Sequence, residues 1–361
     1  MLAVIETVIL EYGREAYLPF ERKCSLKQEI FHAIRGLDIL EELLQNEAVT
    51  EIMVNGHRSI FYEKEGRLFR WEKQFSSEER LRDVIQKMAA GANRIVNEAS
   101  PVADTRLPDG SRVNIVLPPV SLDGPAVTIR KFSRTPYTME RLIGMGALSE
   151  QAGKYLAEAV GRRRNIFISG GTGSGKTTFL NALSAYIPGE ERIITIEDAA
   201  ELQIRSSPNL VRLEVRNANT EGCSAVTVRD LIKTALRMRP SRIIVGEVRG
   251  AEALDMLQAM NTGHEGSLST GHANSAEDMI SRLETMVLQG SDIPLSAVRR
   301  QIASAIDIFV QLCRRRDGSR GVLQICENRG LQNGEIVLKP VFEYCGTAGE
   351  GRVCRCGEAE L

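Results

Sequence analysis

The sequence predicts an α/β protein in which a mainly parallel sheet, covered by helices on both faces, follows a smaller α+β domain. Three observations predict this fold. In the second half of the chain, apolar strands alternate with helical segments, and a glycine-rich loop joins one of these strands to a helix. In the first half, short strands are separated by turn signals. Continuous apolar strands between helices are typical of parallel sheets that are buried on both faces.

The composition is that of an ordinary globular protein with room for two or three domains. The chain has 361 residues, of which 43% are hydrophobic, and its formal net charge is −1. This balance gives no support to nucleic acid as an obligatory partner. No run approaches the roughly 18 apolar residues of a membrane span, so we expect a cytoplasmic protein. Cys345, Cys354 and Cys356 lack the paired spacing of a zinc site, so we expect no zinc.

The first half reads as helices leading into a small antiparallel sheet. Ser76 and Glu79 are spaced as a capping box, which predicts a helix that ends at Gly91. Short strands are expected at residues 51–54, 59–62 and 67–71, and two more beside the turns at 108–110 and 122–125. The predicted domains are a helical segment at 1–35, an α+β domain at 36–132, a linker at 133–138, an α/β domain with the parallel sheet at 139–342 and a tail at 343–361.

The second half carries a phosphate-binding loop in its required context. The parallel strands are expected at residues 165–169, 192–196, 242–245 and 266–270. The loop that follows the first of them matches G-x-x-x-x-G-K-[ST] and consists of Gly170, Gly171, Thr172, Gly173, Ser174, Gly175, Lys176 and Thr177, with Thr178 next in the helix. Backbone N–H groups of such a loop converge on phosphate oxygens. Lys176 is expected to reach the β- and γ-phosphates of ATP, and Thr177 to bind Mg²⁺.

Acidic residues follow two other strands at the same sheet edge. Glu247 comes after the strand 242–245, where it can reach Mg²⁺ through water or activate the attacking water, although Gly246 stands where an aspartate is common. Glu197, with Glu201 close behind as a possible metal ligand, follows the strand 192–196. Open α/β sheets bind ligands at this carboxyl edge. The alternative is that these acids only cap the helices that follow.

Two histidines, His264 and His272, lie on either side of the strand at 266–270. An imidazole can donate a hydrogen bond to a phosphate oxygen, so both are candidates for sensing the γ-phosphate. A structural role is the simpler interpretation of a single histidine.

Several of these segments resemble the type II/IV secretion ATPase superfamily, with the best match to its CpaF/TadA branch, which powers assembly of Flp (tight adherence) pili. The resemblance rests on residues 49–56, 106–119, 127–132, 196–202, 237–275 and 281–290. It implies a RecA-like P-loop ATPase core preceded by a smaller, PAS-like α+β domain. The paired C-x-x-C zinc module of the general secretion and type IV pilus assembly ATPases is missing, which favours the CpaF-like branch.

The resemblance also implies partners and further site residues. It implies a homo-hexamer at the inner face of the cytoplasmic membrane, acting with a polytopic platform protein and with pilin or secretion machinery. Arg106, Arg112 and Arg130 match positions at which the N-terminal domain supplies arginines to the phosphates. The alternative is that all three are solvated charges at strand ends.

Two other functions share the same core. A RecA-like nucleic-acid motor needs a basic track interleaved with aromatic residues, but aromatic residues are only 5% of the chain. A nucleotide-gated scaffold would bind ATP without hydrolysing it. The sequence favours an ATPase that converts hydrolysis into domain motion.

Overall fold

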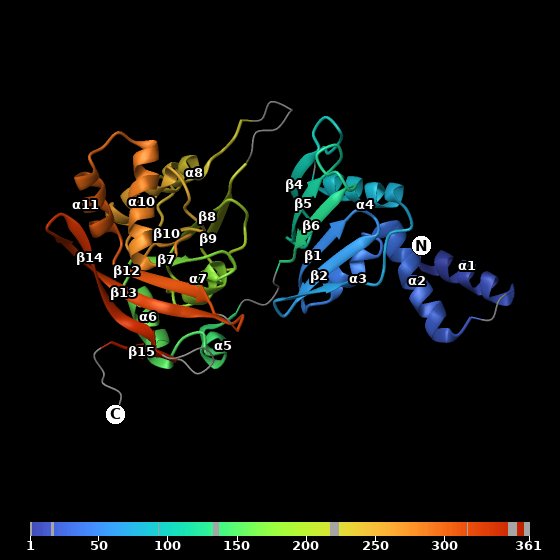
Figure 1. Cartoon of the computed structure of the whole chain (residues 1–361), viewed down its shortest axis with the longest axis horizontal. Coiled ribbons are helices and arrows are strands. Elements are labelled where there is room, and N and C mark those ends of the chain that lie inside the picture. The colour runs from blue at the N-terminus through green and yellow to red at the C-terminus, as the bar shows by residue number, and fades with distance from the viewer. Residues whose placement is uncertain are drawn as a thin grey trace. The chain divides into compact units, whose positions relative to one another are not determined.

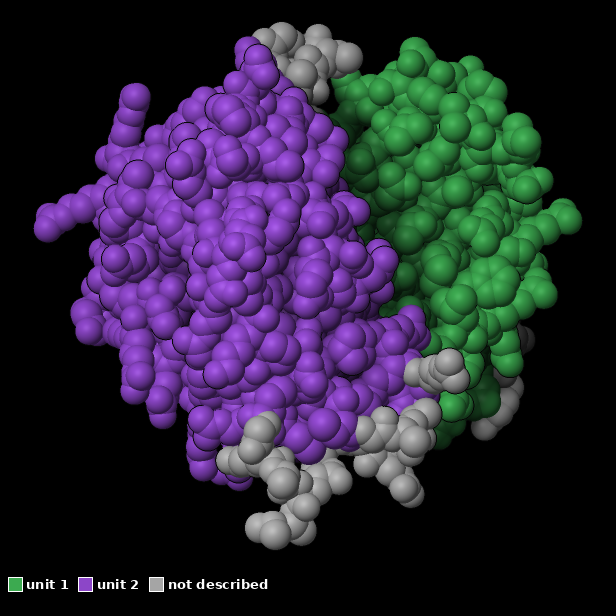
Figure 2. Space-filling view, turned by 60° about the vertical axis from the view of Figure 1, so that its left-hand side comes forward, with its two compact units in different colours: residues 1–134 green, residues 135–361 purple. Residues whose placement is uncertain are grey.

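The chain divides into two units, residues 1–134 and 135–361, each with its own sheet and hydrophobic core. Figure 2 colours them separately. The computed structural model describes residues 2–15, 18–92, 94–132, 137–216, 224–315, 317–345 and 352–356. Most of the expected linker, residues 133–136, lies outside these described residues.

The first unit is built on a six-stranded sheet with the strand order β3-β2-β1-β6-β5-β4, in which every neighbouring pair is antiparallel (Figure 1). Its strands are β1 (Val49–Asn55), β2 (Ser59–Lys64), β3 (Arg67–Arg70), β4 (Val102–Arg106), β5 (Arg112–Val116) and β6 (Ala126–Arg130). Its helices are α1 (Leu2–Glu15), α2 (Phe20–Arg35), α3 (Leu40–Gln45) and α4 (Glu78–Gly91). The core lies between the sheet and the apolar sides of α3 and α4.

The N-cap of helix α4 lies one residue later than expected. Ser77, not Ser76, is the N-cap residue, and its side chain accepts a hydrogen bond from the backbone N–H of Arg80. The residue three positions after Ser77 is therefore an arginine, which cannot return a hydrogen bond as an acceptor, so a single cap replaces the predicted capping box.

The second unit is built on a nine-stranded sheet with the order β15-β14-β13-β12-β7-β11-β10-β8-β9. The six strands from β12 to β9 in this order are parallel, and β13 to β15 add an antiparallel extension. The strands are β7 (Ile166–Gly170), β8 (Ile193–Glu197), β9 (Leu210–Glu214), β10 (Arg242–Val245), β11 (Leu268–Gly271), β12 (Ile308–Arg314), β13 (Arg320–Gln332), β14 (Glu335–Cys345) and β15 (Arg352–Arg355).

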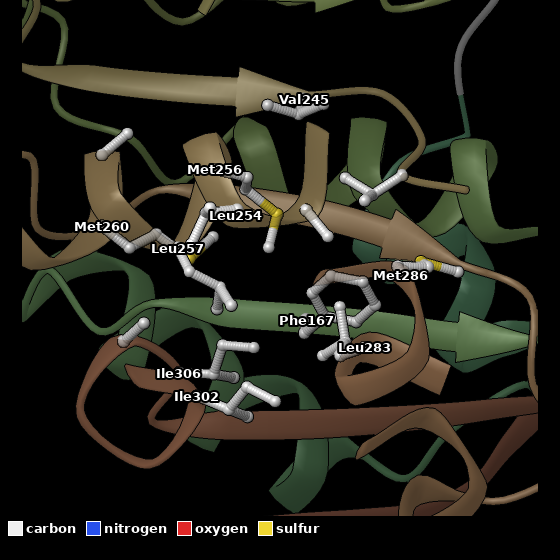
Figure 3. Close-up of a cluster of buried hydrophobic side chains, with 14 of the residues drawn as sticks. Phe167, Val245, Leu254, Met256, Leu257, Met260, Leu283, Met286, Ile302 and Ile306 are labelled. Atoms are coloured by element: carbon white, nitrogen blue, oxygen red, sulfur yellow. The ribbon is translucent and has the colours of Figure 1, made fainter. Parts of the chain in front are cut away.

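Helices cover both faces of this sheet, which confirms the predicted fold class. The helices are α5 (Met139–Gly144), α6 (Glu150–Gly161), α7 (Lys176–Ser184), α8 (Val228–Ala235), α9 (Glu252–Asn261), α10 (Ala276–Gly290) and α11 (Leu295–Ala305). Helices α5 to α7 bury apolar side chains in one core, and α8 to α11 in the other. Figure 3 shows the second core, with Phe167 of β7 beside Leu283 of α10.

The segment expected as a C-terminal tail takes part in this sheet. Residues 343–345 complete β14, and β15 pairs with them at the sheet edge, with Glu343 opposite Cys354. Val353 of β15 is buried. Separately, none of the helices in the described parts of the chain has the length and apolar character needed to cross a membrane.

Candidate functional site

The strand order determines which side chains meet at the carboxyl edge of the parallel sheet. Strand β11 lies between β7 and β10. Because the three strands are parallel, the residues that follow them emerge at one edge. His272 follows β11 and therefore stands between Lys176, which follows the loop after β7, and Glu247, which follows β10.

The loop after β7 has the backbone that a phosphate cradle needs. Gly173 and Gly175 have φ values of 72° and 94°, in the left-handed region that glycine adopts without strain. Helix α7 begins directly after Gly175, so its N-terminal N–H groups point into the loop. The hydroxyl of Ser174 is buried and has no hydrogen-bond partner among the described residues. These features fit an anionic ligand held by backbone N–H groups.

A line of two contacts runs from the loop lysine through His272 to the strand-end acid. Lys176 Nζ donates to the carbonyl oxygens of Gly170 (3.0 Å) and Gly171 (3.1 Å) and lies 3.3 Å from Nδ1 of His272. Nε2 of His272 lies 2.9 Å from Oε1 of Glu247. The structure therefore brings together three residues that the sequence predicted for the site.

The same contacts set the charge state of the imidazole. The ammonium group of Lys176 can only donate, so Nδ1 of His272 accepts and Nε2 carries the proton donated to Glu247. Burial, followed by the charge of Lys176, lowers the pKa of His272, while Glu247 opposes this effect. A neutral imidazole thus links the phosphate-binding lysine to the acid.

Glu197 lies one strand beyond Glu247, at the end of β8, and is only 4% exposed. Its Oε2 accepts hydrogen bonds from the backbone N–H groups of Glu201 and Leu202, and its Oε1 is buried with no hydrogen-bond partner among the described residues. Burial raises the pKa of Glu197 to about 7. A Cβ atom at Gly246 would lie 3.0 Å from Cγ of Glu197, which explains why glycine stands where an aspartate was expected.

An arginine that follows Glu247 by two residues joins the two acidic segments. Arg249 forms an ion pair with Asp198, and its Nη2 lies 3.8 Å from Oε2 of Glu247. The sequence contained a signal for this contact, because Arg249 comes only two residues after Glu247 and both residues follow the same strand.

His264 occupies the opposite edge of the sheet. It precedes β11, and its Nδ1 lies 3.2 Å from the carbonyl oxygen of Pro240, which precedes β10. Residues that flank one strand lie at opposite ends of it, so the structure does not bring His264 to the phosphate loop of its own chain. The prediction that His264 and His272 lie together at one nucleotide site is therefore wrong within a single chain.

The three candidate arginines form a row in the first unit. Arg106 pairs with Arg112 across β4 and β5, and Arg112 pairs with Arg130 across β5 and β6. Residues in register share a face of the sheet, so the three side chains lie on one face. Glu51 of β1 is in register with Arg130 and continues the same row.

An open hollow of about 570 Å³ lies beside the tip of the phosphate loop. Gly171 and Thr172 line one side, and His272 lies at its base with Ala273 and Asn274. Helix α10 supplies the rest of the lining, namely Asp278, Ser281, Arg282 and Thr285. The sequence assigned none of these helix residues to the site, although three of them lie in the segment 281–290 that carries part of the family resemblance.

The fold and the loop define a P-loop protein with a RecA-like core. The family model for "Type II/IV secretion system protein" matches residues 34–352. The chain belongs to this family, because the match covers more than half of its length.

Similar proteins agree with this family. A putative conjugal transfer protein of Mycobacterium tuberculosis is 38% identical over 298 residues, covering 81% of this chain and 84% of the relative. The type IV secretion system protein PtlH of Bordetella pertussis is 35% identical over 322 residues, covering 82% and 95%. A crystal structure of the pilus retraction motor PilT with bound ADP has a TM-score of 0.59 at 21% identity, covers 84% of this chain and 82% of PilT, and supports the fold alone.

Proposed function

We propose that this protein is an ATP-hydrolysing motor of a type II/IV secretion or pilus assembly system. The observation that carries the proposal is the line of contacts from Lys176 through His272 to Glu247 at the phosphate loop. Binding of phosphate, without hydrolysis, requires only the loop and its lysine, Lys176. A connected acid at the adjacent strand end is what hydrolysis additionally requires.

The residues have separate roles in this proposal. The loop Gly170–Thr178 holds the phosphates of ATP, with Lys176 at the β- and γ-phosphates. Glu247 orients the attacking water. When ATP binds, Lys176 must leave His272 and the loop carbonyl oxygens and bind phosphate oxygens instead. His272, which also contacts Glu247, thereby couples the presence of the γ-phosphate to Glu247. Glu197, whose pKa of about 7 allows it to exchange a proton near neutral pH, supports Glu247 from the next strand.

The donor set also fits Mg²⁺. The cation prefers oxygen ligands and retains several waters. Thr177 lies half-buried in the first turn of α7, and the Glu247 side chain is 28% exposed, so a hydroxyl and a carboxylate are accessible at one sheet edge. Thr177 and Glu247, with Glu201 as a further candidate, would hold Mg²⁺, which neutralises phosphate charge when bound.

Arg106, Arg112 and Arg130 would supply positive charge to the phosphates from the first unit. Their alignment in one row supports this role. We further propose a homo-hexamer at the cytoplasmic face of the inner membrane, where domain motion acts on a polytopic platform protein. The type IV secretion role stated for PtlH, which is 35% identical to this chain, supports such a setting. Assignment to the CpaF/TadA branch rests on the sequence motifs.

The test is phosphate release from ATP by the full chain in the presence of Mg²⁺. Lys176→Ala and Glu247→Gln should each reduce kcat by at least about 100-fold. Lys154→Ala is the matched control, because the Lys154 side chain is 72% exposed on α6 and pairs with the exposed Glu150. Equal rates in the wild type and both site variants would contradict the proposal, and tight ATP binding without phosphate release would favour a nucleotide-gated scaffold.

A further inference from the structure

Gln311 is a buried glutamine within an apolar strand. It lies on β12 between Val310 and Leu312, and it is 2% exposed. Burying an amide costs free energy unless its N–H and C=O groups form hydrogen bonds. The sequence Ile308-Phe-Val-Gln-Leu312 contained this signal, since a polar residue in a strand buried on both faces needs specific partners.

The partners of Gln311 are two segments of the phosphate site. Its Oε1 accepts a hydrogen bond from Oγ of Ser169 at 2.5 Å, and its Nε2 donates to the carbonyl oxygen of Ala273 at 3.1 Å. A second donation goes to the carbonyl oxygen of Leu312 at 3.2 Å. Ser169 is the last residue before the loop begins at Gly170, and Ala273 directly follows His272. One side chain thus joins the strand that carries the loop to the segment that carries the imidazole.

The strand register explains how one side chain reaches both segments. Gln311 pairs with Ser169 across β12 and β7, and Ser169 pairs with Gly271 across β7 and β11. Residues in register share a face of the sheet, so Gln311 and Ser169 are neighbours, while Gly271 has no side chain in the third position. This row lies on the sheet face that also carries Phe167, in the core shown in Figure 3.

We propose that Gln311 is a positioning residue that holds the imidazole of His272 in place relative to the phosphate loop. The inference rests on the proposed ATP hydrolysis and deepens it. His272 lies 3.3 Å from Lys176 and 2.9 Å from Glu247, so a shift of residues 272–273 changes both contacts together. A misplacement of about 1 Å at a reacting site can reduce the rate by about 100-fold.

The first experiment compares Gln311→Met with a matched control in the same sheet. Methionine has a similar length and volume but no amide. Asn165→Leu is the control, because Asn165 is also a buried amide and is 4% exposed. Asn165 directly precedes β7, at the end of that strand away from the phosphate loop, and its side chain donates to the carbonyl oxygen of Ala305. Both variants should lower the melting temperature, because both leave buried backbone groups without partners. Only Gln311→Met should reduce kcat, by about 100-fold with a smaller change in KM.

The second experiment asks whether Gln311 acts through His272. In a His272→Ala background, adding Gln311→Met should change kcat less than twofold, because the group that Gln311 positions is already gone. Residues that act as one unit have non-additive effects. A loss of the same factor in both backgrounds, or equal losses of kcat in Gln311→Met and Asn165→Leu, would overturn the positioning role. A wild-type protein that does not hydrolyse ATP would instead contradict the proposed function.

The third experiment does not depend on hydrolysis. The chain has four histidines, so His272→Ala assigns the ring-nitrogen NMR signals of His272 by difference. Gln311→Met should shift these signals, whereas Asn165→Leu should leave them unchanged. If Gln311→Met leaves the His272 signals unchanged, the inference is wrong whatever the protein does with ATP.

Discussion

The two ends of the parallel sheet in residues 135–361 hold their charged side chains in opposite ways. At the amino end, Arg242 is fully buried and donates to both carboxylate oxygens of Glu191, at 2.6 and 2.9 Å, and to the carbonyl oxygens of Val160 and Gly266. At the carboxyl end, the side chains of Glu247 and Arg249 are 28% and 60% exposed. One end is closed around satisfied charges, and the other leaves its charged groups able to change partners.

The two ends also shift glutamate pKa values in opposite directions. Hydrogen bonds from Arg242 lower the pKa of Glu191, whereas burial raises the pKa of Glu197 to about 7. The same residue type is therefore held ionised at one end and poised to exchange a proton at the other. The comparison indicates that the amino end stabilises the sheet, while the carboxyl end is available for chemistry.

Removing Arg242 from the amino end of the sheet should have the largest effect on the free energy of unfolding. Arg242→Met leaves the mostly buried Glu191 without its bidentate partner, and removing one member of a buried ion pair costs about 3–5 kcal/mol. The free energy of unfolding, measured by urea denaturation, should fall by that amount, while kcat of the folded fraction should change little. A loss below about 1 kcal/mol would show that the amino end is not the stabilising end.

A pH titration of stability should detect Glu197. Its folded-state pKa of about 7 is above its ordinary value of 4.5, so the folded protein binds a proton more tightly than the unfolded chain. The stabilisation is present below pH 4.5 and is lost as the pH rises through 7, by up to about 3 kcal/mol. Glu197→Gln should remove this part of the pH dependence in urea denaturation. Identical pH profiles for wild type and variant would contradict the raised pKa.

Gly246→Ala should perturb the carboxyl end locally. The added methyl group would lie 3.0 Å from Cγ of Glu197, so Glu197 must move, at a cost of about 1–2 kcal/mol in stability and with a loss of ATPase activity. Gly161→Ala is the control, because a Cβ atom at Gly161 meets nothing within 4 Å. Thermal denaturation and phosphate release measure the two effects. Equal behaviour of the two variants would show that the close approach to Glu197 is unimportant.

The smallest effect on stability is expected from the exposed ion pair. Arg249→Ala removes the contact with Asp198, but exposed pairs contribute about 0–1 kcal/mol because water screens them. Urea denaturation should therefore show a loss several times smaller than that of Arg242→Met. A loss as large as that of Arg242→Met would remove the distinction between the two ends.

Much of the fold followed from local patterns. The four expected parallel strands correspond to β7, β8, β10 and β11, with boundaries that differ by up to two residues. Alternation of apolar strands with helices is a local signal, so it can be recognised in the sequence without knowledge of the tertiary structure. The observed N-cap of α4 is Ser77 and not the expected Ser76. Both serines are good cap residues, and the choice between them depends on how the preceding chain packs.

The site was only partly predictable. The sequence supplied Lys176, Glu247 and His272, but not their order in space. It grouped His264 with His272, although the two lie at opposite ends of β11. It did not place Gln311 in the site, because a polar residue in an apolar strand indicates that partners are needed but not which distant segments supply them. Roles for Arg106, Arg112 and Arg130 at the phosphates stay a prediction.

By itself, the sequence determined the phosphate loop, because its glycines, Lys176 and the flanking strand and helix are consecutive in the chain. Only the tertiary structure decided what surrounds that loop. The insertion of β11 between β7 and β10 places His272 between Lys176 and Glu247, and the register of β12 places Gln311 beside Ser169. Strand order and register arise from packing between residues far apart in sequence, which is why no local motif could specify them.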